Sequence, residues 1–359
     1  MSAHFEKIPV KQIKKETEDC VSVLLDVPEH LKEKFQYRHG QHLTLRTFIN
    51  GEELRRNYSL CSSPLQNEWR IAVKKLNGGL FSSFANEQLK IGDELEIMPP
   101  MGHFSITLNA TNKKQYVAFA AGSGITPVIS IIKTVLALEA KSNIILVYAN
   151  RNRLSIIFKE ELEALKNKYM NRFSVIFILS REKTDAAINH GRIDAAKCEQ
   201  LFSKVLNIHS DEFFICGPEE MIFIVKDFLE QKGVAQKKIH FELFTTPDQK
   251  KTTVVRHTPK EASGAKSKIV VKLDGRAFDF ELLFSSDESI LDAALKQGAD
   301  LPFACKGGVC CTCKAKLMEG EVDMDVNYGL DQEEVDQGFI LTCQSHPRTE
   351  TVVVDYDVK

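Results

Sequence analysis

Short runs of alternating apolar and polar residues dominate the N-terminal part of the chain. Four of these runs are DCVSVLLDV, GQHLTLRTF, EWRIAVKKL and DELEIMPP, and Gly, Asn and Pro punctuate them. A period of two gives each strand one apolar face, which is typical of antiparallel sheets and small barrels. We therefore predict an antiparallel β-barrel domain over residues 1–108.

A different pattern covers residues 113–247. Near-continuous apolar runs, such as QYVAFAAG and NIILVYANR, alternate with amphipathic stretches, such as PVISIIKTVLALEA and EMIFIVKDFLEQKG. Apolar strands between amphipathic helices are typical of a parallel sheet covered on both faces. This region is predicted to be an α/β domain with a parallel sheet.

A polar, turn-rich segment at 248–266 has no apolar periodicity and is predicted to be a linker. Strand patterns resume in residues 267–359 with SKIVVKLDGRAFDFELL, which indicates two strands about a D-G turn. A helical stretch, SILDAALKQG, and a closing strand, TVVVDY, complete an α+β unit. The predicted fold class is therefore multidomain: an antiparallel barrel, a parallel α/β domain and a compact α+β domain.

The composition is that of a globular protein with sizeable cores, since 43% of the residues are hydrophobic and 27% are charged. The N-terminal residues lack the apolar core of a signal peptide. The most apolar helical stretch, PVISIIKTVLALEA, contains Lys133 and is too short to span a bilayer. We expect a cytoplasmic protein that does not bind membranes.

Charge is unevenly distributed along the chain. Residues 266–359 contain 18 acidic and 10 basic residues, a balance of −8, whereas the rest of the chain carries +6, and the total is −2. The C-terminal unit is therefore acidic and the remaining body mildly basic. No basic stripe or aromatic ladder indicates a nucleic-acid partner.

Four cysteines lie within residues 305–313, and another follows later. The spacing is Cys305-x4-Cys310-x2-Cys313, with Cys343 about thirty residues further on. This spacing is that of plant-type [2Fe–2S] clusters, whose two irons are held by four thiolates. The sequence therefore predicts an iron–sulfur cluster, which carries one electron at a time.

Two other interpretations of these cysteines are weaker. Zinc sites usually combine two C-x2-C pairs or add histidines, and this segment has one such pair. Structural disulfides are disfavoured in the cytosol. Gly307 and Gly308 are expected to turn the loop with positive φ and to aim backbone N–H groups at inorganic sulfides. Cys311 fits no ligand position, so it is predicted to be an apolar filler.

Two further motifs precede the cysteines. The stretch LRRNYSLCSSP contains Arg56-x-Tyr58-Ser59, a weak signal by itself, because it also suits a strand with surface side chains. About twenty residues later, KKLNGGLFSSFAN places Ser82 and Ser83 at the expected start of a helix. Free N–H groups and hydroxyls there suit a pyrophosphate.

The stretch VAFAAGSGITPVISII is an apolar strand, a glycine turn and a helix. Gly122, Gly124 and Pro127 give the form G-x-G-x-x-P, and Thr126 adds a hydroxyl. Such a turn can hold dinucleotide phosphates at a helix N-terminus. Another apolar strand ends in Cys216-Gly217-Pro218, and ILSRE places Ser180 and Arg181 after a third. Buried packing is the alternative for Cys216, and a solvated surface position is the alternative for Arg181.

In this order, the motifs resemble the ferredoxin–NADP reductase superfamily with a C-terminal plant-type ferredoxin domain of β-grasp fold. The resemblance implies that FAD, NADPH and a [2Fe–2S] cluster are bound. It implies that Arg56 meets the flavin phosphates, Tyr58 stacks on the flavin and Ser59 hydrogen-bonds near N5. Gly79 and Ser82 would contact the pyrophosphate. His39 replaces a turn proline of relatives, which we expect to matter little.

The resemblance also assigns roles in the second domain. Cys216 would lie beside the nicotinamide, and Ser180 with Arg181 would hold the 2′-phosphate that distinguishes NADPH. Glu242 and Phe244, in IHFELF, would lie near the flavin. The residues implied to be catalytic are Ser59, Cys216 and Glu242. Those implied to bind cofactors are Arg56, Tyr58, Ser59, Gly79, Ser82, Ser83, Gly122, Gly124, Thr126, Pro127, Ser180, Arg181, Cys216, Gly217, Pro218 and Phe244.

The domain order is that of oxygenase reductases. The stretches GEELRRNYSLCSSP, AAGSGITP, HGRID and SILDAALKQGADLPFACKGGVCCTCKAKL resemble the reductases that serve phenylacetyl-CoA epoxidases. This resemblance implies electron flow from NADPH through FAD and the cluster to a multicomponent di-iron epoxidase in phenylacetate degradation. A ring-hydroxylating oxygenase as partner, or an iron–sulfur module without NADPH oxidation, remain the alternatives.

Overall fold

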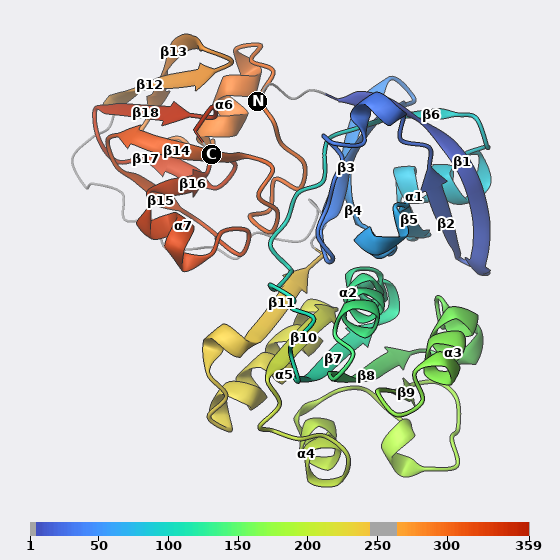
Figure 1. The fold of residues 1–359 in the computed structure, drawn as a ribbon. Helices are drawn as coiled ribbons and strands as arrows, with labels where there is room; N and C mark the ends of the chain where they lie inside the picture. The colour runs from blue at the N-terminus through green and yellow to red at the C-terminus, as the bar shows by residue number, and fades with distance from the viewer. Residues whose placement is uncertain (1–4, 245–263, 359) are drawn as a thin grey trace.

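The computed structural model describes residues 5–244 and 264–358. These residues form three units, each built on its own main sheet (Figure 1). The predicted linker lies outside the described residues except for its last three positions, 264–266. No helix within the described ranges has both the length and the apolar character needed to cross a membrane.

The first unit is a six-stranded antiparallel sheet in the order β4-β3-β6-β1-β2-β5. Its strands are β1 (Glu6–Thr17), β2 (Cys20–Leu25), β3 (His42–Ile49), β4 (Glu52–Ser59), β5 (Trp69–Lys74) and β6 (Glu94–Ile97). A bridge between Leu60 and Ile71 brings the two edge strands together, so the sheet closes into a barrel. Alternate residues, such as Leu43 and Leu45, fill its core, as the period of two predicts.

The second unit is a five-stranded parallel sheet in the order β11-β10-β7-β8-β9. Its strands are β7 (Gln115–Ala121), β8 (Asn143–Asn150), β9 (Phe173–Leu179), β10 (Glu212–Gly217) and β11 (Ile239–Leu243). Its helices are α2 (Ile125–Leu138), α3 (Lys159–Lys168), α4 (Ala195–Lys204) and α5 (Glu219–Gln231).

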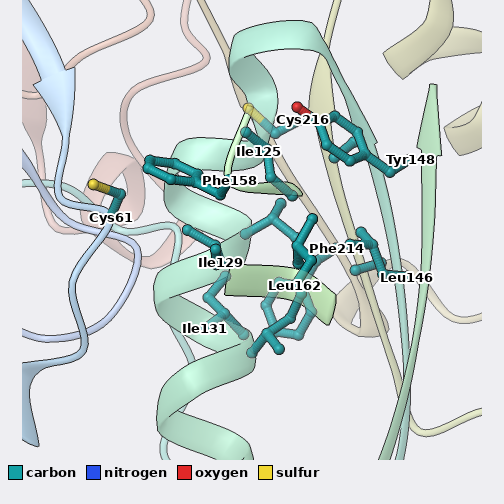
Figure 2. Close-up of a cluster of buried hydrophobic side chains, with 14 of the residues drawn as sticks. Cys61, Ile125, Ile129, Ile131, Leu146, Tyr148, Phe158, Leu162, Phe214 and Cys216 are labelled. Carbon is teal, nitrogen blue, oxygen red and sulfur yellow. The ribbon is translucent and has the colours of Figure 1, made fainter. Parts of the chain in front are cut away.

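Side chains of the parallel sheet alternate between two apolar cores. Phe214 and Cys216 point into a cluster with α2 and α3, which Figure 2 shows with Ile125 and Leu162. Phe213 and Ile215 pack on the opposite face, against α4 and α5. Both faces are therefore buried, which explains why these strands are apolar throughout.

The third unit is a mixed five-stranded sheet in the order β13-β12-β18-β14-β16. Its strands are β12 (Lys266–Leu273), β13 (Arg276–Leu283), β14 (Lys314–Glu319), β16 (Phe339–Leu341) and β18 (Thr351–Asp355). A small second sheet pairs β15 (Val322–Met324) with β17 (Ser345–Pro347), and the helices are α6 (Ile290–Lys296) and α7 (Gln332–Asp336).

The predicted D-G turn joins β12 and β13. Asp274 and Gly275 both adopt positive φ, at 52° and 69°, between the paired residues Leu273 and Arg276. This conformation matches the right-handed twist of a two-residue hairpin. The predicted fold class, an antiparallel barrel followed by a parallel α/β unit and an α+β unit, is confirmed.

Candidate functional site

All three units meet at one cavity of about 490 Å³. The barrel contributes Tyr58 and Ser59 to its wall, the parallel sheet contributes Glu242, and the C-terminal unit contributes Cys305 and Cys310. The structure thus brings together residues that are far apart in the sequence and that belong to three different predicted motifs.

Strand β4 carries the R-x-Y-S motif to the cavity. Asn50 and Gly51 form the turn before it with positive φ, at 53° and 82°, which sets the register of β3 against β4. Arg56 and Tyr58 line the cavity from this strand. The Tyr58 ring lies 5.3 Å from that of Phe81, measured between centroids. A planar aromatic ring beside a cation is a suitable wall for a flavin.

The turn after β5 leads into α1 (Leu80–Glu87). Gly79 is the N-cap of this helix, so the helix begins close to the predicted position. The Ser82 hydroxyl accepts the Leu76 N–H at 3.0 Å and donates to the Gly79 carbonyl at 3.1 Å, so it holds the turn in shape. Ser82 borders the cavity, whereas Ser83 is not among the residues that line it.

Helix α2 fixes the parallel unit against the end of β4. Ser130 Oγ donates to the Ser62 carbonyl at 2.6 Å, and Lys133 Nζ donates to the Cys61 carbonyl at 2.9 Å. Ser63 and Thr134 hydroxyls lie 2.9 Å apart. The barrel residues in these contacts come directly after the R-x-Y-S motif, and their partners lie on α2, directly after the glycine turn. The contacts therefore hold the R-x-Y-S motif and the glycine turn at a fixed separation.

The glycine turn precedes α2. Gly122 has a φ of 54°, and a Cβ on Gly124 would lie 2.2 Å from the Cys216 carbonyl oxygen. Only glycine lets the turn approach the end of β10 this closely. Thr126 Oγ1 donates to the Ser123 carbonyl at 3.0 Å, and Pro127 falls in the first turn of α2.

Ser59, Cys216 and Glu242, predicted as a set, lie together. Ser59 Oγ donates to Glu242 Oε2 at 3.1 Å, and Cys216 pairs with Glu242 between the parallel strands β10 and β11. Burial raises the pKa of the Glu242 carboxyl to about 8, while the Ser59 hydrogen bond opposes this shift. Burial and the neighbouring Glu242 raise the pKa of Cys216 well above its usual value.

Cys216 itself is fully buried in the apolar cluster that includes α2 and does not line the cavity. Figure 2 shows it near Ile125. Gly217 follows it, and Pro218 is the N-cap of α5. Ser180 and Arg181 follow β9, the far edge strand of the sheet, and are also not among the lining residues. Arg181 is exposed at the carboxyl edge of the sheet, where ligands of such sheets bind.

The cysteine loop faces the cavity at one end. The sulfurs of Cys305 and Cys310 lie 3.1 Å apart, and their contact lowers the pKa of Cys310 while it raises that of Cys305. Cys310, Cys313 and Cys343 are buried, whereas Cys305 is partly exposed. None of the nine cysteines forms a disulfide. Buried, closely spaced sulfurs without disulfides suit a metal–sulfur cluster, and thiolates are the form that binds iron.

The backbone of this loop differs in one respect from the prediction. Gly308 has a positive φ of 72°, as expected, but Gly307 does not, and Lys306 has a φ of 50° instead. The prediction of positive φ for Gly307 was therefore wrong. Its N–H is still aimed at sulfur, since it donates to Cys305 Sγ at 3.3 Å. Cys311 is buried in the apolar core of the unit, as predicted.

Sequence reasoning missed other residues at the cavity. His42 and Asn57 both line it. His42 Nε2 has no hydrogen-bond partner among the described residues, and burial lowers the pKa of this imidazole to about 4. A histidine at the start of an apolar strand gave no distinctive signal. Asn57 is the variable position of R-x-Y-S, and it accepts a hydrogen bond from Thr44 at 2.9 Å.

Three protein families match successive parts of the chain. Residues 7–106 match the oxidoreductase FAD-binding domain, residues 119–227 the oxidoreductase NAD-binding domain, and residues 271–348 the 2Fe-2S iron-sulfur cluster binding domain. The matches follow the order of the three sheets, and the cavity lies where these three units meet.

Two known proteins resemble the chain over nearly its whole length. It is 45% identical to a component of 1,2-phenylacetyl-CoA epoxidase from Escherichia coli K12, covering 99% of this chain and 98% of that protein. It is 32% identical to the ferredoxin reductase component of 3-ketosteroid-9-alpha-monooxygenase from Rhodococcus rhodochrous, covering 97% and 96%.

Among solved structures, phthalate dioxygenase reductase aligns over 98% of both chains with a TM-score of 0.58 and 23% identity. An intact type IV self-sufficient cytochrome P450 monooxygenase aligns over 98% of this chain and 41% of that one, with a TM-score of 0.71 and 21% identity. These likenesses support the fold.

Proposed function

Because the chain belongs to the family of oxygenase reductases that join FAD-binding, NAD-binding and 2Fe-2S domains, we propose that it supplies electrons to a phenylacetyl-CoA epoxidase. Electrons would pass from NADPH through FAD and the [2Fe–2S] cluster to the di-iron site of that partner. The flavin supplies the conversion from two-electron to one-electron chemistry.

A single observation carries this proposal: one cavity is bounded by the R-x-Y-S strand, by Glu242 and by Cys305 with Cys310. A flavin in this cavity would have the nicotinamide side of the molecule at one wall and the cysteine loop at another. This arrangement would give electrons a short path from the flavin to the cluster.

The proposed site residues fall into groups by cofactor. Arg56 would hold the flavin phosphates, Tyr58 would stack on the ring, and Ser59 would meet it near Glu242. Gly79, Ser82 and Ser83 would shape the pyrophosphate turn. The glycine turn and Thr126 would hold the phosphates of the nicotinamide cofactor, and exposed Arg181 with Ser180 would favour its 2′-phosphate. The proposed cluster ligands are Cys305, Cys310, Cys313 and Cys343.

The proposed domain division is 1–108, 113–247 and 267–359, with a linker between the last two. We propose a cytoplasmic location, which fits nine cysteines without a disulfide. The acidic C-terminal unit favours a partner with a basic docking surface. Identity of 45% to an epoxidase component, against 32% to a steroid monooxygenase component, favours the epoxidase as that partner.

Anaerobic titration with NADPH, followed in the visible spectrum, tests the relay. We expect both flavin and iron–sulfur bands to bleach, and NADH in a parallel run to be less effective. Bleaching of the flavin alone would contradict transfer to the cluster, and no bleaching would contradict the reductase function. Reconstitution with purified epoxidase and with a ring-hydroxylating oxygenase then identifies the acceptor by substrate-dependent NADPH oxidation.

A further inference from the structure

Arg55 joins the barrel to the segment that leads into the cysteine loop. It lies on β4 next to the proposed flavin residue Arg56, and only 7% of its surface is exposed. A buried guanidinium is costly unless its donors and its charge are satisfied. The residues that satisfy its donors and its charge therefore indicate the role of Arg55.

Three of these contacts are with the C-terminal unit. Arg55 Nη1 donates to the Leu301 carbonyl at 3.2 Å, and Nη2 lies 3.8 Å from Asp300 Oδ1. Its Cζ lies 3.9 Å from the centroid of the Phe303 ring. The contacted residues fall within five positions before Cys305, so Arg55 holds the entry to the cysteine loop.

The other contacts orient the guanidinium from the barrel side. Arg55 Nε donates to Glu53 Oε1 at 2.7 Å, and Cζ lies 5.2 Å from the centroid of the Phe5 ring. The guanidinium is therefore held by a carboxylate of its own strand and lies near two aromatic rings, one from each unit. Its planar shape allows stacking and hydrogen bonding at once, which a lysine cannot reproduce.

Other polar contacts between these two units are weaker. The Thr44 and Thr312 hydroxyls lie 3.5 Å apart, at the limit of a hydrogen bond. His103 Nε2 lies 3.5 Å from Glu334 Oε1, but its side chain is 44% exposed. The two threonines are more deeply buried than Arg55, but only Arg55 combines a hydrogen bond, an ion pair and an aromatic contact across the two units.

We propose that Arg55 is a positioning residue for electron transfer from flavin to cluster. It fixes residues 300–303 against the flavin strand, so that Cys305 stays at the cavity wall. This inference rests on the proposed function. It adds that the contact of Arg55 with residues 300–303 sets the distance for electron transfer from flavin to cluster. No bond is made or broken by Arg55, since it acts through the segment that it holds.

The test measures two steps separately in the full-length holoprotein. Anaerobic stopped-flow mixing with NADPH gives the rate of flavin reduction and the rate of cluster reduction, and their ratio reports internal transfer. Because Arg55 also borders the cavity, flavin content and flavin reduction are measured in every variant. Dithionite reduction of the cluster shows whether the cluster itself is intact.

We expect Arg55→Ala to lower the ratio of cluster reduction to flavin reduction by roughly ten-fold, equivalent to about 1.4 kcal/mol. Arg55→Lys should show most of this loss, because it keeps the charge but not the planar fork. Phe303→Leu removes the ring on which the Arg55 guanidinium lies and should also lower the ratio of cluster reduction to flavin reduction. The double variant should be less than additive, since the two side chains act together.

Arg46 provides a matched control. It is the cross-strand neighbour of Arg55, and its Cζ lies 4.1 Å from the Phe5 centroid, but its ion pairs are with Glu53 and Glu96 of the barrel. Arg46→Ala should leave the ratio unchanged.

Three results would overturn the proposal. They are an unchanged ratio in Arg55→Lys and Phe303→Leu, an equal loss in Arg46→Ala, and loss of dithionite-reducible cluster in the Arg55 variants. Failure of NADPH to reduce the cluster in the unaltered protein would instead contradict the proposed function.

Discussion

At the scale of single residues, Glu242 is a cavity group whose acidity is strongly altered by its surroundings. It lines the cavity and accepts a hydrogen bond from Ser59. Burial raises its pKa to about 8, so at neutral pH it is mainly a neutral acid. A neutral carboxyl adds no negative charge to the cavity that we propose to hold the flavin.

We therefore predict that flavin reduction by NADPH slows as the pH rises through about 8, the pKa of Glu242. Ionisation would place a negative charge in a low-dielectric cavity, where it opposes hydride arrival. Glu242→Gln keeps a neutral side chain, so its rate should stay flat across this range. The measurement is the stopped-flow rate of flavin reduction from about pH 6 to about pH 10, which covers about two pH units on each side of the transition.

The same shift has a consequence for stability. The folded-state pKa lies above the ordinary value of 4.5, so the folded state binds this proton more tightly. Protonated Glu242 therefore contributes to the free energy of unfolding in full below pH 4.5, and this contribution is lost as the pH rises to about 8.

The Ser59 hydrogen bond lowers the pKa of Glu242. Ser59→Ala removes this bond, so the pH at which flavin reduction slows should be higher in this variant. A transition that persists unchanged in Glu242→Gln would contradict the assignment.

At the residue level, the sequence indicated which side chains lie together where a motif fixes both residue type and spacing. The cysteines converge because their spacing is a property of the loop, and Arg56, Tyr58 and Ser59 share one strand. His42 was missed because its significance depends on its surroundings. The positive φ at Lys306 was missed because a lysine gives no sign of a left-handed conformation.

At the scale of elements, the glycine turn before α2 approaches β10 so closely that it leaves no room for a side chain at Gly124. A Cβ at Gly124 would meet the backbone of Cys216 and Gly217, at 2.2 Å from the Cys216 oxygen and 2.7 Å from the Gly217 nitrogen. Backbone atoms of a central strand cannot move aside as a flexible side chain can. The turn must therefore shift if Gly124 is replaced.

We predict that Gly124→Ala weakens NADPH binding by roughly ten-fold or more, because overpacking against rigid atoms costs about 1–3 kcal/mol. Binding is measured by titration of the oxidised protein, with flavin content as a check on folding. Gly122→Ala is the control, because a Cβ there meets nothing within 4 Å and only its positive φ of 54° is disfavoured. Equal effects of the two substitutions would contradict the role of close approach.

The elements themselves could be predicted from periodicity. The alternating runs became the barrel strands, the apolar runs became the parallel strands, and LDGR became a tight hairpin. Each of these signals is local. Ser82 was less predictable, because its hydroxyl is engaged within its own turn rather than left free.

At the scale of the whole molecule, the sequence predicted three units but not how they meet. Arg55 and Leu301 are 246 positions apart, and Thr44 and Thr312 are 268 apart. Contacts of this kind depend on the shapes of folded surfaces, which no local pattern encodes. The common cavity, and with it the wall formed by Cys305, emerged only from the structure.

Charge, in contrast, was readable from sequence and bears on the partner. The C-terminal unit has a balance of −8 against +6 for the rest of the chain. If this unit docks on a basic surface of the oxygenase, electrostatic steering should speed their association and salt should weaken it. Hydride transfer to the flavin, and reduction of a small dye by the flavin, do not require the acidic unit to dock on another protein.

We therefore predict that raising the salt concentration from about 0.1 M to about 1 M slows reduction of the oxygenase roughly ten-fold, because the Debye length falls from about 10 Å to about 3 Å. Dye reduction by NADPH should change little over the same range. Glu333→Lys, on exposed α7 of the acidic unit, should reduce the salt sensitivity of oxygenase reduction. Glu18→Lys makes the same charge change on the exposed surface of the barrel and should not. Equal salt effects on the two acceptors would mean that charge does not guide docking, and association would then depend on surface shape and apolar contact.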